Sequence, residues 1–303
     1  MGAGPHDRRL GLQRRLLAAI AIAAAAAVVE ILGSWLSGSL ALLSDAAHVG
    51  TDAFALGLSL WALRVSGRPH TPAMSFGYHR MEVLAALANG GLLVAIAGYL
   101  AVQAYGRYMD PPPIQGGIMF SVGLAGLLAN VTMLALLRGW AKRNINARGA
   151  FLHVYGDTLG SVGVVGAAAA IQFTNLLRLD VVVAAFIVSL ILLSAARLLR
   201  DAVRIVLEAT PAELRPQEIA KAILAVPGVR GAHDLHVWTV TSGLYALTGH
   251  ILASGDVTVH DASHLVERVQ AMLRDRFGIA HATLQVDSLQ HEMIPAADLA
   301  RKP

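Results

Sequence analysis

The chain has 303 residues, of which 55% are hydrophobic and 15% are charged, and this composition excludes an ordinary soluble globular protein. It contains 12 histidines but no cysteine, which excludes disulfides, thiolate metal sites and cysteine nucleophiles. The net charge of +4 comes from basic residues scattered over short segments between apolar runs, so nucleic-acid binding is not expected.

Six apolar segments are long enough to cross a bilayer as helices, because a hydrocarbon core of about 30 Å requires roughly 20 apolar residues. The first segment follows a basic N-terminus, but its apolar run continues past Glu30, so we interpret it as a retained span and not as a signal peptide. A proline-rich turn, "YMDPPPIQGG", separates the third segment from the fourth. The predicted spans are residues 15–37, 40–64, 81–106, 114–138, 149–173 and 179–200.

Arginine and lysine collect in alternate loops. They precede the first span, follow the second, the fourth and the sixth, and are represented in the opposite loops only by Arg107 and Arg178. By the positive-inside rule, both termini are expected in the cytoplasm. The composition is typical of a bacterial protein, and we expect an integral protein of the inner (cell) membrane.

The composition of the sequence changes from apolar to polar after the sixth span. A polar, proline-punctuated linker, "EATPAELRPQE", leads us to assign residues 1–207 to a transmembrane domain and residues 208–303 to a small cytoplasmic domain. Helical spacing and β-forming runs then follow in the order αββαβ, which predicts a two-layer α+β module. The predicted helices are residues 216–226 and 260–277, and the predicted strands are residues 231–241, 244–254 and 281–288.

The second helix and the last strand of this module give two finer expectations. Asp261 is the predicted N-terminal cap of the helix, because it stands just before the periodic apolar residues. The last strand alternates strictly, so Leu284 and Val286 should face the helices while Asp287 faces the other way.

Two histidine and aspartate pairs recur at one spacing: His48 with Asp52 in "LLSDAAHVGTDAF", and His153 with Asp157 in "AFLHVYGDTLG". Positions i and i+4 share a helix face, so the members of each pair point together. An aspartate at mid-membrane costs about 2.5 to 3.5 kcal/mol, so these groups should face a cavity or each other. If the second and fifth spans pack side by side, two nitrogens and two oxygens converge on a tetrahedral site suited to Zn²⁺.

The charge of such a site explains the use of two carboxylates. Two aspartates neutralise a divalent ion, whereas the empty site would carry two uncompensated charges in a low dielectric. Burial favours the protonated carboxylate and histidine titrates near neutrality, so metal and protons compete for the same groups. These residues therefore predict an antiporter that exchanges metal for protons.

Simpler or different interpretations of these residues stay open. Each pair is also consistent with a structural hydrogen bond inside a helix bundle. Glu30 is better explained as an internal hydrogen-bond partner than as a metal ligand. Asp45, one turn before His48, fits either a role beside the metal and its entry path or a helix cap. An intramembrane zinc enzyme needs a general base, but Val49 and Val154 follow the two histidines. A membrane-anchored metal sensor would not need the paired histidine and aspartate ligands inside the membrane.

Four longer stretches carry a resemblance to a known family: "SGSLALLSDAAHVGTDAFALGLSLWA", "FGYHRMEVLAALANG", "NINARGAFLHVYGDTLGSVGVV" and "HDLHVWTVTSG". Over nearly its whole length the chain resembles the cation diffusion facilitator family. The resemblance implies six transmembrane helices, a cytoplasmic ferredoxin-like domain without its first strand, a homodimer, and proton-coupled export of a divalent metal with no catalytic cofactor. It places the transported ion at His48, Asp52, His153 and Asp157. Two histidines with two aspartates resemble the zinc-transporting members, although cadmium or cobalt can also pass.

The resemblance also implies a regulatory zinc site in the cytoplasmic domain. His233, His250 and His264 match positions that bind zinc in some members, with Asp287 as a carboxylate ligand. Gln285 stands where some members have a histidine, which reduces the implied site from two ions to one or none. The alternative is that these are ordinary polar surface or strand residues.

Two features of some relatives are not expected in this chain. The loop between the second and third spans offers His70 and His79 but no carboxylate, so a second metal site there is not expected. The loop between the fourth and fifth spans, "RGWAKRNINARG", contains no histidine, so it is not expected to buffer metal.

Overall fold

A computed structural model describes residues 5–141, 145–241, 243–253 and 257–288. The chain divides into two compact units. The first comprises Met1–Trp61 and Ala85–Leu199, and the second comprises Ala62–Leu84 and Arg200–Pro303. The second unit therefore combines the segment around the second interhelical loop with the C-terminal third of the chain.

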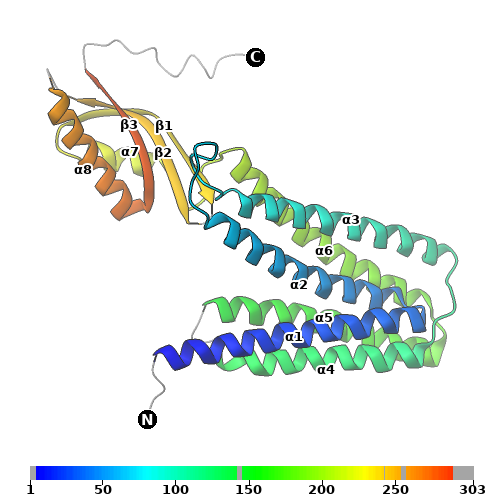
Figure 1. Ribbon diagram of the computed structural model, residues 1–303. Coiled ribbons are helices and arrows are strands. Elements are labelled where there is room, and N and C mark those ends of the chain that lie inside the picture. The colour runs from blue at the N-terminus through cyan, green and yellow to red at the C-terminus, as the bar shows by residue number, and fades with distance from the viewer. Residues whose placement is uncertain (1–4, 142–144, 242, 254–256, 289–303) are drawn as a thin grey trace. The chain divides into compact units, whose positions relative to one another are not determined.

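All six predicted spans are helices (Figure 1). Most of them extend a few residues beyond the predicted apolar segments, because a helix can continue into the polar turn that flanks a bilayer core. The helices are α1 (Pro5–Ser37), α2 (Leu40–Ser66), α3 (Met81–Met109), α4 (Gly116–Ala141), α5 (Ile145–Thr174) and α6 (Arg178–Val206).

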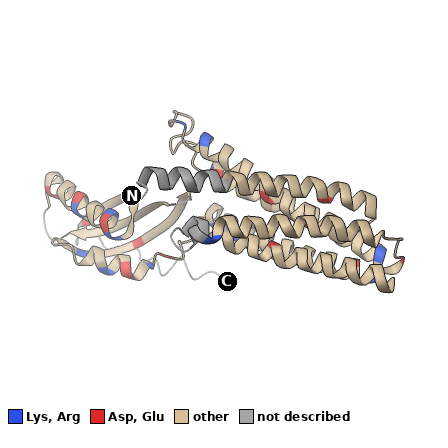
Figure 2. Ribbon diagram, turned by 90° about the horizontal axis from the view of Figure 1, so that it is seen from below, with Lys and Arg blue, Asp and Glu red and all other residues tan. Residues whose placement is uncertain are grey.

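Five of these helices are long and apolar enough to cross a membrane, namely those containing Leu17–Ser37, Met81–Met109, Gly116–Arg138, Phe151–Thr174 and Arg178–Val206. The helix α2 has 27 residues, which is also long enough, but Asp45, His48 and Asp52 lower its hydropathy. In Figure 2 the Lys and Arg residues of the long apolar helices lie near helix ends, whereas single acidic residues lie along these helices. The polar residues of α2 are therefore the feature that sets it apart from its neighbours.

Side chains from several of these helices form one apolar core in the first unit. Leu42 of α2, Met119 of α4 and Val164 of α5 are fully buried in it. The helix α4 packs against both α1 and α5. On α2 this core occupies the first two turns, before His48.

A buried carboxylate holds the start of α2 against the start of α6. Asp180, in the first turn of α6, is completely buried. Its oxygens accept hydrogen bonds from the Ser39 hydroxyl at 2.5 Å and from the backbone N–H groups of Leu40 and Ala41 at 2.7 and 3.1 Å. Asp180 thus satisfies N–H groups that a helix N-terminus leaves free and places negative charge at the positive end of its dipole.

We predict that Asp180→Ala lowers the free energy of unfolding by on the order of 2 kcal/mol, because the buried N–H groups lose their acceptor. Thermal unfolding of the detergent-purified protein measures the effect as a lower Tm. Asp201→Ala is the control, since this α6 carboxylate is exposed and pairs with its neighbour Arg200. Equal Tm values for Asp180→Ala and the wild type would contradict the proposed cap.

The second unit contains a three-stranded sheet with two helices on one face (Figure 1). Strand β1 pairs with β2 in antiparallel fashion. Strand β2 pairs with β3 in parallel, because α8 connects them and returns the chain to the end of the sheet at which β2 begins. The observed order αββαβ confirms the predicted module. Its elements are α7 (Pro216–Leu224), β1 (Val229–Thr241), β2 (Leu244–Ala253), α8 (Val259–Phe277) and β3 (Ile279–Ser288).

The two faces of this sheet differ in polarity. Leu247 and Ile251 of β2 are buried in a core with apolar residues of α7 and α8, and Leu284 and Val286 of β3 pack on the same core, as predicted. Asp287 lies on the other face. The polar face is therefore the one turned away from the helices.

The predicted cap of α8 is wrong by three residues. Thr258 occupies the N-cap position, and its hydroxyl oxygen accepts a hydrogen bond from the backbone N–H of Asp261 at 3.2 Å. Asp261 lies inside the first turn, where its carboxylate accepts from the Thr258 hydroxyl. The two residues share the capping, and sequence spacing alone did not separate their roles.

Candidate functional site

The structure brings together the four residues of the two histidine and aspartate pairs. His153 Nε2 lies 3.0 Å from Asp52 Oδ2 and 3.7 Å from Asp157 Oδ2. His48 Nε2 lies 3.3 Å from Asp157 Oδ1, and its Nδ1 lies 3.8 Å from Asp52 Oδ2. Each histidine therefore contacts both aspartates, and the four side chains close a ring between α2 and α5. We call these four residues the tetrad.

The tetrad is buried on one side and open on the other. The side chains of His48 and Asp157 are 16% and 8% exposed, whereas those of Asp52 and His153 are 33% and 50% exposed. Asp52, His153 and Asp157 line a cavity of about 550 Å³, together with apolar residues of α1 and α4 that include Ala19 and Leu137. The tetrad is thus reached through a largely apolar cavity.

The far side of the tetrad is closed by packed side chains. Leu42, on α2 before His48, and Val164, on α5 after Asp157, are both completely buried in the apolar core. Close packing of this kind leaves no room for a hydrated ion. In this conformation the tetrad is open to the cavity and shielded by the apolar core on the side of Leu42 and Val164.

The donor set of the tetrad fits a divalent metal of the zinc type. Two imidazole nitrogens and two carboxylate oxygens are the ligands and the number that tetrahedral Zn²⁺ prefers. The Nδ1 atom of His48 is buried without a hydrogen-bond partner among the described residues. An unpaired buried nitrogen of this kind is free to bind an ion or a proton.

Asp45 lies beside the tetrad and not in its ring. It is 2% exposed, and its Oδ2 accepts a hydrogen bond from Ser161 Oγ of α5 at 3.0 Å. Asn130 of α4 donates in turn to Ser161 at 2.9 Å. A helix cap does not fit, because Asp45 lies in the second turn of α2 and Asp180 binds the first N–H groups. Ser161 and Asn130 were missed in the sequence, where single polar residues in a span carry no spacing signal.

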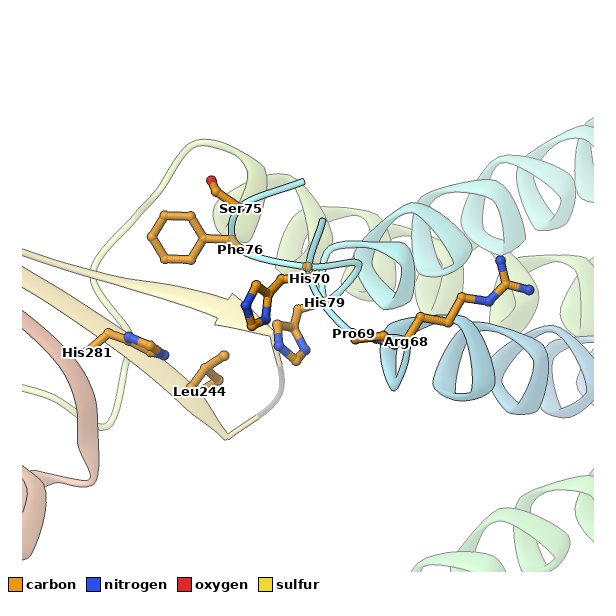
Figure 3. Close-up of a pocket in the computed structure, with 9 residues that line it drawn as sticks. Arg68, Pro69, His70, Ser75, Phe76, His79, Leu244 and His281 are labelled. Atoms are coloured by element: carbon orange, nitrogen blue, oxygen red, sulfur yellow. The ribbon is translucent and has the colours of Figure 1, made fainter. Parts of the chain in front are cut away.

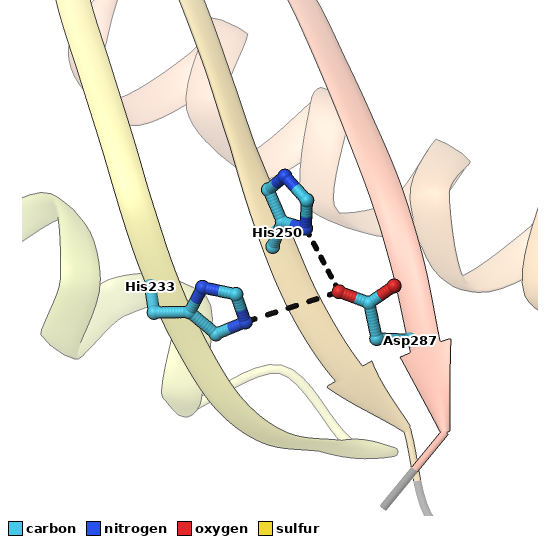
Figure 4. A group of neighbouring side chains, drawn as sticks. All are labelled: His233, His250 and Asp287. Atoms are coloured by element: carbon cyan, nitrogen blue, oxygen red, sulfur yellow. Dashed lines mark hydrogen bonds and ion pairs between the residues drawn. The ribbon is translucent and has the colours of Figure 1, made fainter. Parts of the chain in front are cut away.

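A second group of ligand-type side chains lies on the polar face of the soluble sheet (Figure 4). His233 of β1, His250 of β2 and Asp287 of β3 each offer a ligand atom, and these atoms lie within 4.8 Å of one another. Asp287 Oδ2 is 2.8 Å from His250 Nδ1 and 3.9 Å from His233 Nε2. The Nε2 atom of His233 is buried and has no hydrogen-bond partner among the described residues.

His264 lies apart from these three residues within the chain. It is on α8, which covers the opposite face of the sheet, and its ring contacts His260 at a centroid distance of 4.5 Å. Its Nδ1 is 3.3 Å from a carboxylate oxygen of Glu267 on the next turn. The structure therefore assembles three of the four ligands that the resemblance implied.

Gln285 takes part in this group as a hydrogen-bond donor. Its Nε2 donates to Asp287 Oδ1 at 2.8 Å. This bond, followed by that with His250, lowers the pKa of Asp287 below its usual value, against the opposing effect of burial. The carboxylate is thus kept in the ionised form that a metal requires.

We predict that Gln285→Leu raises the pKa of Asp287 toward the ordinary value of about 3.9, because the donor is lost. Since the folded-state pKa is depressed, the stabilisation is present above the ordinary pKa and disappears as the pH falls through the depressed value. An NMR titration of the Asp287 carboxyl carbon in the metal-free protein measures this. Thr283→Val, on the same strand face, should leave the titration unchanged; an unchanged curve for Gln285→Leu would contradict the assignment.

The loop between α2 and α3 lines a separate hollow of about 390 Å³ in the second unit (Figure 3). His70 and His79 enter it from the loop, and His281 enters from β3. Arg68 is the charged residue among the lining, and no carboxylate lines the hollow in the described part of the chain. Among the described residues this hollow therefore offers no carboxylate to a metal, and the lack of a carboxylate in the loop was the reason for not expecting a metal site there.

Comparison with known proteins gives matches over most of the chain. Residues 16–207 match the family model for the cation efflux transmembrane domain, and residues 211–289 match that for the cation efflux protein cytoplasmic domain. The chain is 38% identical over 298 residues to the metal cation efflux system protein CzcD of Cupriavidus metallidurans, covering 98% of this chain and 94% of that protein.

Two further relatives carry more specific names. The zinc transporter ZitB of Escherichia coli is 40% identical over 276 residues, which is 90% of this chain and 87% of that protein. The cadmium, cobalt and zinc/H(+)-K(+) antiporter of Bacillus subtilis is 32% identical over 289 residues, which is 94% of this chain and 93% of that protein.

Proposed function

Because the chain belongs to the cation diffusion facilitator family of cation efflux transporters, we propose that it exports Zn²⁺ from the cytoplasm in exchange for protons. The family consists of transporters, so the alternative of an intramembrane zinc enzyme is not supported. The observation that carries the proposal is the ring in which each tetrad histidine contacts both tetrad aspartates across α2 and α5. The tetrad is the proposed transport site.

The ligand set of the tetrad favours zinc as the transported ion. Imidazole nitrogens suit Zn²⁺ and related ions, whereas sites built from oxygens alone suit Mg²⁺, Ca²⁺ and Mn²⁺. Cd²⁺ and Co²⁺ are the secondary candidates, and the name of the Bacillus subtilis relative includes both metals.

The exchange of zinc for protons follows from the charge of the tetrad. With zinc bound, the two carboxylates Asp52 and Asp157 balance the ion. When zinc leaves, two negative charges would remain, one on the buried Asp157 and one on Asp52 at the wall of the apolar cavity, so protons bind to the histidines and carboxylates in its place. The same groups therefore carry zinc in one direction and protons in the other.

The position of the cavity suggests the direction of loading. It lies toward the ends of α1 and α4 that carry Ala19 and Leu137. The basic residues before the first span and after the fourth predict that these ends face the cytoplasm. We infer that this conformation admits zinc from the cytoplasm, and that export requires the apolar core around Leu42 and Val164 to open.

We predict that Asp157→Ala reduces proton-driven zinc flux at least tenfold, since it removes a ligand and a balancing charge from the tetrad. The flux is measured in proteoliposomes with an imposed pH gradient and an internal zinc dye. Thr158→Ala is the matched control, because the Thr158 hydroxyl donates to the Val154 carbonyl of its own helix. Wild-type flux in Asp157→Ala would exclude the tetrad, and zinc flux that ignores the pH gradient would indicate a channel or uniporter.

We further propose that the soluble domain binds one regulatory zinc ion per subunit at His233, His250 and Asp287 and acts within a homodimer. Two observations support this assignment: the close spacing of the three ligand atoms, and the buried Nε2 of His233, which has no hydrogen-bond partner among the described residues. Three protein ligands leave a fourth position of zinc for another group. Binding there would couple cytoplasmic zinc to transport through the relative stability of the conformations.

His250→Ala is expected to remove one bound zinc per subunit from the purified full chain, because two side chains cannot complete a zinc site. Equilibrium dialysis with metal analysis counts the ions at a zinc concentration that saturates the wild type. His236→Ala is the control: this histidine lies on the same strand as His233 but contacts Asp234. An unchanged count in His250→Ala would reject the regulatory site while leaving the transport site intact.

A further inference from the structure

A buried acidic residue of α1 lies outside the tetrad. Glu30 is only 2% exposed, and its Oε2 has no hydrogen-bond partner among the described residues. Its Oε1 lies against Gly126 of α4, where any Cβ atom would overlap it. Gly126 therefore leaves the space that the Glu30 carboxyl group fills. The internal hydrogen bond that the sequence favoured for Glu30 is thus not found at Oε2 among the described residues.

The surrounding helices add further polar groups to this region. Asn130 lies one turn after Gly126 on α4 and donates through Ser161 to Asp45, as described above. Glu30 interacts electrostatically with Asp45 of α2 and with Asp157 of α5. The Glu30 carboxyl group is thus within electrostatic reach of the tetrad without being one of its ligands.

No Lys or Arg of the surrounding helices balances the negative charges near Glu30. Residues 17–37, 40–63, 116–137 and 151–174 contain no Lys or Arg, and residues 116–137 of α4 contain no titratable side chain. The titratable groups that act electrostatically on Glu30 are Asp45 and Asp157, and His48 acts on Asp45. An ionised Glu30 would be an uncompensated charge in a low dielectric, so it must hold a proton while the tetrad is empty.

We propose that Glu30 binds an exchangeable proton and releases it when a divalent ion occupies the tetrad. The positive charge of the ion stabilises the Glu30 anion, and by linkage a proton on Glu30 weakens metal binding. The inference rests on the proposed exchange of zinc for protons and adds to it a proton-binding group that is not a metal ligand.

The test counts the protons that zinc displaces from the purified full chain. Calorimetric zinc titrations in two buffers of different ionisation enthalpy give this number. Glu30→Gln keeps the shape of the side chain but cannot ionise, so it should release about one proton fewer per zinc and show a weaker pH dependence of zinc affinity. Gly126→Ala keeps the acid but displaces its carboxyl group, and it should also lower the proton count.

Ser34→Ala is the matched control on α1, since the Ser34 hydroxyl donates to the Ile31 carbonyl of the same helix. It should release as many protons as the wild type. A wild-type count in Glu30→Gln overturns the inference and leaves the exchange intact, and if that variant does not fold, a wild-type count in Gly126→Ala does the same. Zinc binding to the wild type without any proton displacement overturns the proposed exchange itself.

Discussion

The physical constraint on which this protein depends is the cost of an unbalanced charge in a low-dielectric interior. The apolar helices provide a dry environment, and α2 and α5 place two carboxylates and two histidines inside it. In water such groups would be ionised independently, but here their charge state depends on what occupies the site. A divalent ion or a set of protons would each restore the balance, so the same constraint underlies both the proposed binding and the proposed exchange.

The same constraint accounts for polar groups away from the tetrad. Asp180 is completely buried, yet its charge is spread over a hydroxyl and two backbone N–H groups at the start of α2. Asp45 is held by Ser161, and Glu30 is left with an unpaired oxygen. The satisfied carboxylate has a structural role, whereas the unsatisfied one is available for a proton.

Much of the fold and of the candidate site follows from periodicity. The six helices and the αββαβ module appear where the apolar runs and the alternation predict them. The spacing shared by His48 with Asp52 and by His153 with Asp157 already indicates that the two members of each pair lie on one face of their helix. The cap of α8 and the place of His264 did not follow, because Thr258 and Asp261 are both good capping residues and a helix position does not reveal which sheet face it covers.

The sequence by itself determined the number of apolar helices, the order of the soluble module and the identity of the ligand-type residues, because bilayer length and side-chain period are local properties of the chain. Only the tertiary structure decided that side chains of α2 and α5 meet at the tetrad, that β1, β2 and β3 bring two histidines to Asp287, and that Oε2 of Glu30 has no hydrogen-bond partner among the described residues. These outcomes depend on packing between segments that are distant in the chain. That packing determines which groups surround each polar side chain and how low the dielectric constant around it is.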